Sequence, residues 1–380
     1  MQKLILFTAI ISQFHLSFAE EKAKQETQAS WAGQMQNLGD VLAQMIPFLS
    51  NPTKFSDPKN APVINDYVKK LSSLSHTLGK GVVNPDADPS LQIVSNQFED
   101  EIKRAQEALN NGHRDYARHL LKNSTSYCIQ CHTRNSTGPH FSDGKLADAI
   151  SQMPNLDRGE FFAATRQFDK ALGEFKQVLK TSKNVIEWDR SARYAMAIAV
   201  RFLSNPEQAL EVAQLILSSD QAPLFLKEDA VIWKRSIVEW QKETQSKKST
   251  QGLKLAEKLI TTARKVQKFE TDHSADIYFL RASAALHDAL SGGLKGEEKS
   301  KALLLTGRCY DALRDLNLWS LHEQYYEACI RNTPHTKISK ECYTKYEQSV
   351  FMGFSGSQGL MLPVDIQAKL TELKALTIAK

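Results

Sequence analysis

Five residues near the middle of the chain have the types and the spacing needed to hold an iron porphyrin covalently. They are Cys128-Ile129-Gln130-Cys131-His132, the C-x-x-C-H pattern in which two thiols add to the haem vinyl groups and the adjacent histidine becomes an axial iron ligand. On a helix, Cys128 and Cys131 share one face because they are three residues apart, and His132 lies one turn after Cys128. The motif therefore predicts one covalently bound haem c.

Two other kinds of site use a pair of cysteines at this spacing, namely a thioredoxin-like redox pair and half of a zinc site. Neither of them requires the histidine that follows the second cysteine. The sequence also has no second cysteine pair with zinc-type spacing. The pattern thus favours covalent haem over both alternatives.

The first nineteen residues have the composition of an export signal. Lys3 supplies the positive end, residues 4–18 are mostly apolar, and Ala19 precedes two glutamates in the manner of a signal-peptidase site. We expect a signal peptide over residues 1–19, cleaved after Ala19, and a periplasmic location, where c-type haem attachment takes place. The alternatives are an uncleaved anchor and a buried first helix. No internal apolar run has the roughly 20 residues of a membrane span.

Four helices are predicted before and through the cysteine motif, from the spacing of apolar residues and from helix breakers. The first runs from about Trp31, with Pro47 expected to kink it or end it early. The second follows Pro62, and the third opens after Asp88-Pro89-Ser90 and ends at Asn110. The fourth runs from about Asp115 into the motif. Short connections make neighbouring helices antiparallel, so we expect an up-down four-helix bundle.

This arrangement, with C-x-x-C-H near the end of the last of four helices, resembles the class II cytochromes c, the family of cytochrome c-prime. The resemblance covers residues 27–140. The run Gln34-Met35-Gln36-Asn37-Leu38-Gly39-Asp40 is similar to the first helix of the members of that family that have a methionine ligand. The resemblance implies a haem in the bundle and an electron-transfer role.

Met35 is the predicted sixth ligand of the iron. In an up-down bundle, the start of the first helix and the end of the fourth lie at the same end, which places Met35 across the core from His132. Met45 shares the apolar stripe of Met35 but lies about 15 Å deeper, so we expect it to pack in the core. Trp31, one turn before Met35, is expected to line the same end of the bundle. The alternative is that Met35 also only fills the core.

From residue 146 to residue 380 the pattern changes to that of tetratricopeptide-like helical hairpins. In such hairpins a small residue on each helix lets its partner approach closely. Small or apolar residues expected at equivalent positions are Ala171, Ala209, Ala256 and Leu321, and their spacings are wider and less regular than the usual 34 residues. We expect one more hairpin in the longest gap, near Asp276 to Leu290. The alternative is an all-helical domain without repeats.

The three remaining cysteines lie in this second half. Cys329 is predicted to end one helix and Cys342 to begin the next, with a turn at Asn332-Thr333-Pro334 between them. Two residues at similar heights on an antiparallel pair can form a disulfide, which would leave Cys309 as a buried free thiol. The alternative is three reduced cysteines.

The composition excludes several classes of protein. The chain has 380 residues, of which 42% are hydrophobic and 24% charged, and its formal net charge is +5. These values are typical of globular domains and too weakly basic for a nucleic-acid partner. His76 lies off the apolar stripe of its helix and is expected at the surface. The sequence also has no phosphate-binding loop and no hydrolase motif.

Together these patterns predict an all-α, exported monohaem cytochrome c that is not an enzyme. It would carry single electrons to a redox partner protein or a membrane electron-transfer complex, and its repeat half would dock that partner. The alternative is a haem-based gas sensor or scaffold with a five-coordinate iron that signals through the repeats. A peroxidase has less support, because one haem offers no second electron store.

Overall fold

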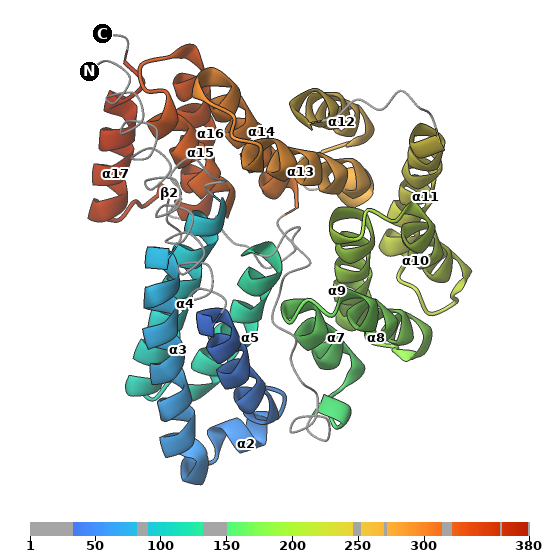
Figure 1. Ribbon diagram of the computed structural model, residues 1–380, viewed down its shortest axis with the longest axis vertical. Coiled ribbons are helices and arrows are strands. Elements are labelled where there is room, and N and C mark those ends of the chain that lie inside the picture. The colour runs from blue at the N-terminus through green and yellow to red at the C-terminus, as the bar shows by residue number, and fades with distance from the viewer. Residues whose placement is uncertain are drawn as a thin grey trace, which may run out of the picture. The chain divides into compact units, whose positions relative to one another are not determined.

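The protein is all-helical in a computed structural model (Figure 1). The structure describes residues 33–81, 90–131, 150–245, 252–269, 272–313, 321–357 and 359–378. Within these ranges, the strands are β1 (Ser355–Gly356) and β2 (Gly359–Leu360), which form one antiparallel hairpin. The predicted signal peptide and its cleavage site, Trp31, His132 and the predicted boundary between residues 140 and 146 lie outside the described residues.

The chain divides into two compact units. The described residues of the first unit are 33–81, 99–121 and 150, and those of the second are 90–98, 122–131 and most of the chain from residue 151 onward. The first unit contains a helix over residues 33–49, α2 (Pro52–Ser56), the 3-10 helix η1 (Pro58–Asn60) and α3 (Ala61–Gly81). Two helices, α4 (Ser90–Asn110) and α5 (Arg114–Cys131), contribute residues to both units.

The core of the first unit is built from apolar residues that recur every three or four positions. In α3 the buried line is Ile64, Val68, Leu71, Ser75 and Leu78. Tyr67 and Leu74, which the sequence pattern places on this line, are half-buried at its edge. Each helix of the unit therefore turns one apolar stripe inward, as amphipathic helices of a bundle do.

The helix over residues 33–49 runs through Pro47 without ending there. The expected early end is therefore wrong. Proline removes one backbone hydrogen bond, but Pro47 is in the last turn, and the Ser50 amide donates to the Ile46 carbonyl at 2.9 Å. This hydrogen bond from Ser50 to Ile46 completes the last turn of the helix.

The second unit consists of helices that follow one another along the chain. They are α7 (Asn155–Ala164), α8 (Phe168–Thr181), α9 (Val185–Ala197), the π-helix η3 (Ile198–Phe202), α10 (Pro206–Ser218), α11 (Leu224–Gln245), α12 (Gly252–Val266), the 3-10 helix η4 (His273–Ala275), α13 (Asp276–Ser291), α14 (Gly296–Ala312), α15 (Leu321–Asn332), α16 (Lys337–Phe354) and α17 (Val364–Ala375). Most of these helices pack against the next one in the chain (Figure 1). The region near Asp276 to Leu290, where a further hairpin was expected, is occupied by the single helix α13.

Local sequence signals set several of these boundaries. Asn184 caps α9 by accepting from the Ile186 amide, and Asn205 caps α10, with proline as the first helical residue. Thr336 and Ser339 form a capping box at the start of α16. These caps satisfy amide groups that a helix start otherwise leaves without partners.

Two glycines let consecutive helices approach closely, as the hairpin pattern predicts. A side chain on Gly159 of α7 would come within 2.7 Å of the Phe175 ring in α8. A side chain on Gly307 of α14 would clash with the Tyr326 ring in α15. Both rings are buried, so they occupy the space that a larger residue would need.

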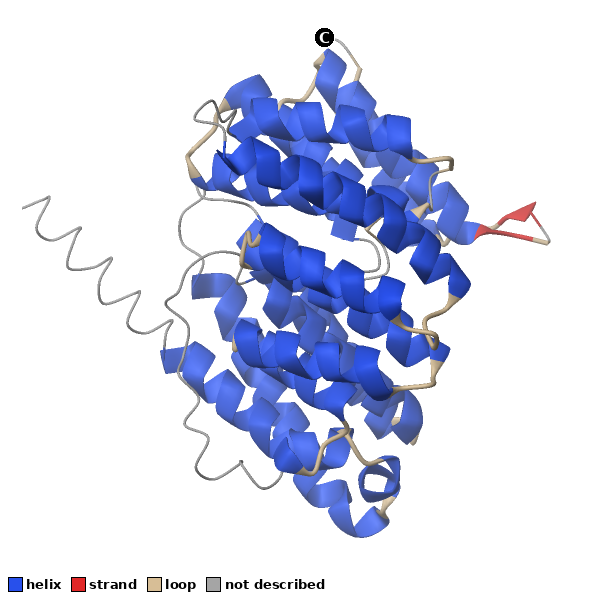
Figure 2. Ribbon diagram, turned by 90° about the vertical axis from the view of Figure 1, so that its right-hand side faces the viewer, coloured by secondary structure: helices blue, strands red, loops and turns tan. Residues whose placement is uncertain are grey.

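The β-hairpin connects the last two long helices and projects beyond the helices (Figure 2). It follows directly on Phe354, the last residue of α16. Among the described residues, no helix is both long and apolar enough to cross a membrane.

Candidate functional site

Helix α5 carries both cysteines of the haem-attachment motif. It begins at Arg114 and ends at Cys131, so Cys128 and Cys131 are one turn apart on a regular helix. The buried residues of α5 are Ala117, Leu120, Leu121, Ser124 and Tyr127. With 3.6 residues per turn, positions 128 and 131 continue the register of this buried set. The positions of Cys128 and Cys131 are therefore one turn apart and share a helical face with the buried positions of α5.

Two arginines join the start of α5 to the N-terminal segment of the first unit. Arg114 donates to the Phe55 carbonyl at 2.5 Å, and Arg118 donates to the Leu49 carbonyl at 2.6 Å. As residue numbers rise from Arg114 to Arg118, those of the carbonyl partners fall from Phe55 to Leu49. The start of α5 therefore runs antiparallel to the segment from residue 49 to residue 55, which includes α2.

Both methionines of the first predicted helix are buried. Met45 is fully buried, and Met35 is 9% exposed near the start of the helix. A thioether in either place fills the core, and only one close to the haem iron can also serve as a ligand.

His76 is an exposed histidine, as the sequence indicates, with 56% of its side chain accessible. Its Nδ1 lies 2.9 Å from Glu99 Oε1 on α4. Lys103 and His76 together hold the pKa of Glu99 below its usual value. His76 thus takes part in a surface ion pair between α3 and α4.

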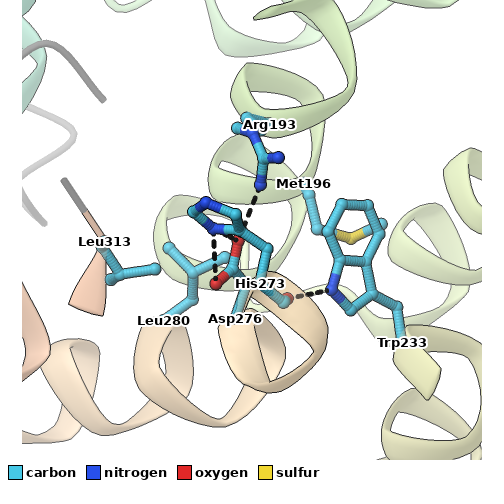
Figure 3. Close-up of a pocket in the computed structure, with 7 residues that line it drawn as sticks. All are labelled: Arg193, Met196, Trp233, His273, Asp276, Leu280 and Leu313. Carbon is cyan, nitrogen blue, oxygen red and sulfur yellow. Dashed lines mark hydrogen bonds and ion pairs between the residues drawn. The ribbon is translucent and has the colours of Figure 1, made fainter. Parts of the chain in front are cut away.

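The second unit contains a polar pocket that no sequence motif indicates (Figure 3). Arg193 of α9 binds Asp276 of α13, with 3.2 Å between Nη1 and Oδ2. His273 Nδ1 lies 3.3 Å from the same Asp276 oxygen, and Trp233 of α11 donates to the His273 carbonyl at 2.8 Å. The pocket joins three helices through groups that are far apart in the sequence, since Arg193 and Asp276 are separated by 83 residues.

Two further carboxylates, Asp189 and Asp229, interact with the Arg193 guanidinium next to this pocket. Arg193 also holds Asp189, with 2.8 Å between Nη2 and Oδ1. Burial raises the pKa of Asp229 to about 6, although Arg193 acts in the opposite direction. The free space is about 10 Å³, enough for about one water molecule and too small for an organic substrate. We therefore assign these residues a structural role.

A second buried polar group lies at the π-helix that follows α9. Arg201 is 1% exposed and donates to the Tyr310 hydroxyl. That hydroxyl lies 2.9 Å from His287 Nε2, and the Tyr310 ring stacks on Tyr325 with 5.3 Å between centroids. π-Helical turns occur frequently at functional sites, and this one places the Arg201 guanidinium against the Tyr310 hydroxyl. It connects η3, α13, α14 and α15.

Cys329 and Cys342 form a disulfide between α15 and α16, with their Cα atoms 6.2 Å apart. Cys309 of α14 is buried as a free thiol. This is the pairing expected from a turn that places the end of one helix beside the start of the next.

The donor set of the motif, two thiols at C-x-x-C spacing followed by a histidine, fits a covalently held haem, which brings four nitrogen ligands of its own. A zinc site would need three or four protein ligands. Among the described residues, no group of three or more His, Cys, Asp or Glu side chains is arranged to hold a metal ion; the thiols of Cys128 and Cys131 and the whole of His132 lie outside the described part of the chain.

Sequence reasoning identified the cysteine motif but missed both polar groups of the second unit. The local sequence gave one indication of the first polar group. Asp272 caps the 3-10 helix η4, and His273 lies three residues before Asp276. Comparison with known proteins adds no further assignment, because no protein-family model, no curated protein and no solved structure matches this chain.

Proposed function

We propose that this chain is a c-type cytochrome with one haem that carries single electrons. The observation that supports this most directly is the C-x-x-C-H sequence at the end of α5, whose cysteine positions continue a buried helical register. Cys128 and Cys131 would hold the porphyrin, and His132 would be an axial ligand.

When bound, the haem would supply a one-electron couple at its iron. The chain's part is to fix the macrocycle against α5, to surround it with apolar side chains and to exclude water. Burial and the identity of the axial ligands together set the reduction potential of such a centre. Core residues of α5 such as Leu120 and Leu121 would contribute to that apolar surrounding.

Met35 is the proposed sixth ligand, and the contact between Arg118 and Leu49 supports this choice. Met35 lies 14 residues before Leu49, about 21 Å along its helix. In the opposite direction, Cys128 and Cys131 lie 10 and 13 residues beyond Arg118, about 15 and 20 Å along α5. In the predicted antiparallel arrangement of the two helices, the distance of about 21 Å from Leu49 to Met35 matches the distance of about 20 Å from Arg118 to Cys131.

Met45 is too close to Leu49 along the helix to lie at the level of the two cysteines. It lies four residues before Leu49, about 6 Å along the helix, and is therefore far short of the level of the cysteines. Its complete burial is that of a core residue. The two methionines thus form a natural pair of test and control.

The second unit would dock the redox partner. Its consecutive packed helices and the close approach at Gly159 and Gly307 are in keeping with a tetratricopeptide-like arrangement, a kind of fold that uses extended surfaces to bind proteins. Export to the periplasm would follow from the predicted signal peptide.

The test is to export the full chain in cells with the c-type haem attachment machinery and to record absorbance spectra of the reduced protein with and without CO. We expect a covalently bound haem with a six-coordinate, low-spin spectrum that CO does not change rapidly. Met35→Ala should give a five-coordinate iron that binds CO, and Met45→Ala should lower stability and leave the ligation unchanged.

Each part of the proposal can fail separately. Loss of haem from denatured protein would exclude covalent attachment, and so would an unchanged haem content when Cys128→Ala and Cys131→Ala are combined. An unaltered spectrum in Met35→Ala would exclude Met35 as the ligand. Rapid CO binding by the unmodified chain would favour a five-coordinate gas sensor over an electron carrier.

A further inference from the structure

The segment around the β-hairpin differs from the rest of the surface in having no charge. From Gln348 to Val364, 17 consecutive residues include no Asp, Glu, Lys or Arg, although 24% of the whole chain is charged. We call residues 352–364 the C-terminal hairpin. Apolar side chains exposed in it include Phe354, Leu360 and Met361.

Most described residues of the C-terminal hairpin are exposed. Both residues of each strand are exposed, and so are the flanking residues Phe354 and Met361, whereas Leu362 is half-buried. The hairpin projects beyond the helices in Figure 2. Its exposed apolar groups are therefore available for contact with a partner.

Other exposed apolar residues lie in charged surroundings. Ile186, which is 74% exposed, has Lys183 and Glu187 close in sequence, and Leu224, which is 73% exposed, has Asp220 and Lys227. Scattered residues of this kind are normal on a soluble surface. The C-terminal hairpin is distinguished by the combination of apolar exposure, projection and complete absence of charge.

We propose that the C-terminal hairpin inserts shallowly into the interfacial region of a lipid bilayer and holds the protein at a membrane surface. A charged side chain is costly in a bilayer, and residues 348–364 contain none. The exposed side chains of the hairpin are apolar or small and uncharged, and a fluid interface can surround a projection of this kind, whereas a flat protein surface would cover only one side of it.

The size of the hairpin argues against a second copy of the chain as its main partner. A stable protein interface takes about 20 to 30 residues on each side, with a polar rim. The C-terminal hairpin has 13 residues and no charged group to form such a rim. A few apolar side chains are enough, by contrast, for reversible attachment to a bilayer surface.

The backbone of the hairpin is also suited to shallow insertion. Ser355 pairs with Leu360 and Gly356 with Gly359 across the two strands. The Met361 amide donates to the Phe354 carbonyl at 3.1 Å, and Ser355 Oγ donates to the Phe351 carbonyl at 2.6 Å. These bonds lower the number of polar groups that would have to leave water.

The test uses the full chain and vesicles of phosphatidylcholine, a lipid without net charge. We expect the protein to sediment with the vesicles at physiological and at high salt, because apolar insertion is not screened by ions. Phe354→Ser and Met361→Ser should each lower the bound fraction by about tenfold. Ile186→Ser, at a site that is also exposed, should leave it unchanged.

A second measurement does not depend on loss of binding. Leu360→Trp should show a blue-shifted emission and quenching by brominated lipid when vesicles are added, and Ile186→Trp should show neither. The proposal is overturned if the unmodified chain does not bind neutral vesicles, or if binding needs anionic lipid and disappears at high salt. It is also overturned if Met361→Ser instead abolishes a concentration-dependent dimer in sedimentation, since that outcome assigns the hairpin to a second copy.

Discussion

Two neighbouring regions of the second unit hold their helices together by different means. Around α9, α11 and α13 the interior contains charged groups, with Arg193 bound to Asp189 and Asp276. Around α14, α15 and α16 it contains a disulfide and a glycine that admits an aromatic ring. The stability of the first region should depend on pH. The stability of the second should depend on whether the disulfide is oxidised and on the size of the residue at position 307.

The largest effect is expected where a buried charge loses its partner. Arg193→Leu would leave Asp276, which is 9% exposed, without its arginine, and should destabilise the second unit by about 3 to 5 kcal/mol. Hydrogen exchange followed by peptide should show the loss in α9 and α13 first.

The matched control for this change is Arg331→Leu. Arg331 binds Glu327 and Glu372 at the surface with 43% of its side chain exposed, so we expect a change of at most about 1 kcal/mol. Equal effects of the two substitutions would contradict the distinction between the two regions.

Removal of the disulfide should have the next largest effect. Cys329 and Cys342 are 13 residues apart in sequence, and loss of a crosslink over such a loop costs about 3 kcal/mol in the chain-entropy treatment. Reduction, or Cys329→Ala with Cys342→Ala, should speed hydrogen exchange in α15 and α16. If α9 and α13 are affected as strongly, the two regions unfold as one.

Gly307→Ala tests the close approach of α14 and α15. The added methyl group would clash with the buried Tyr326 ring, so we expect a loss of about 1 to 3 kcal/mol in thermal or denaturant unfolding. Gly173→Ala in α8 is the control, because nothing lies within 4 Å of the added atom. That variant should gain about 0.5 to 1 kcal/mol from helix propensity.

The smallest expected effect concerns Asp229 and depends on pH. Its pKa is about 6 in the folded chain and near 3.9 when unfolded, so the folded state binds the proton more tightly. The stability due to this proton is present below pH 4 and is lost as the pH rises through 6.

Asp229→Asn should therefore be more stable than the unmodified chain above pH 6, by about 1 to 2 kcal/mol after allowance for partial exposure, and no more stable below pH 4. The measurement is the difference between the two unfolding free energies from pH 4 to 8, with Arg193, His273, Asp272 and Asp276 unchanged. A difference that does not vary with pH would show that Asp229 is not the titrating group.

Local patterns in the sequence predict much of the helical structure. The proline and serine before residue 91 mark the start of α4 at Ser90, and Pro47 lies in the last turn of the helix over residues 33–49. The wide gap between Ala256 and Leu321 indicates further helical structure there, and α13 lies within it. The start of a helix and the periodic spacing of its apolar residues depend on residues that are close in sequence. A single sequence therefore contains the information needed to predict them.

The polar interior could not be predicted in the same way. Arg193 and Asp276 come together only when α9 and α13 pack, and each residue alone has the sequence context of a surface charge. For the candidate haem site, the spacing of Cys128, Cys131 and His132 predicts the chemistry, and the two cysteines lie one turn apart in α5. The choice of Met35 over Met45 depends on the direction of the first helix relative to α5, which is a prediction from short helix connections; the bond from Arg118 to the Leu49 carbonyl gives one point of contact.

The burial of Cys309 affects how readily the disulfide between Cys329 and Cys342 can exchange with a free thiol. A disulfide is rearranged when a thiolate attacks one of its sulfur atoms, so the rate depends on the ionised fraction of any nearby thiol. Burial raises the pKa of Cys309 to about 12, which leaves almost no thiolate at neutral pH. The folded chain therefore protects its own bridge from shuffling, and wrong pairings among these three cysteines can arise only before α14 has packed.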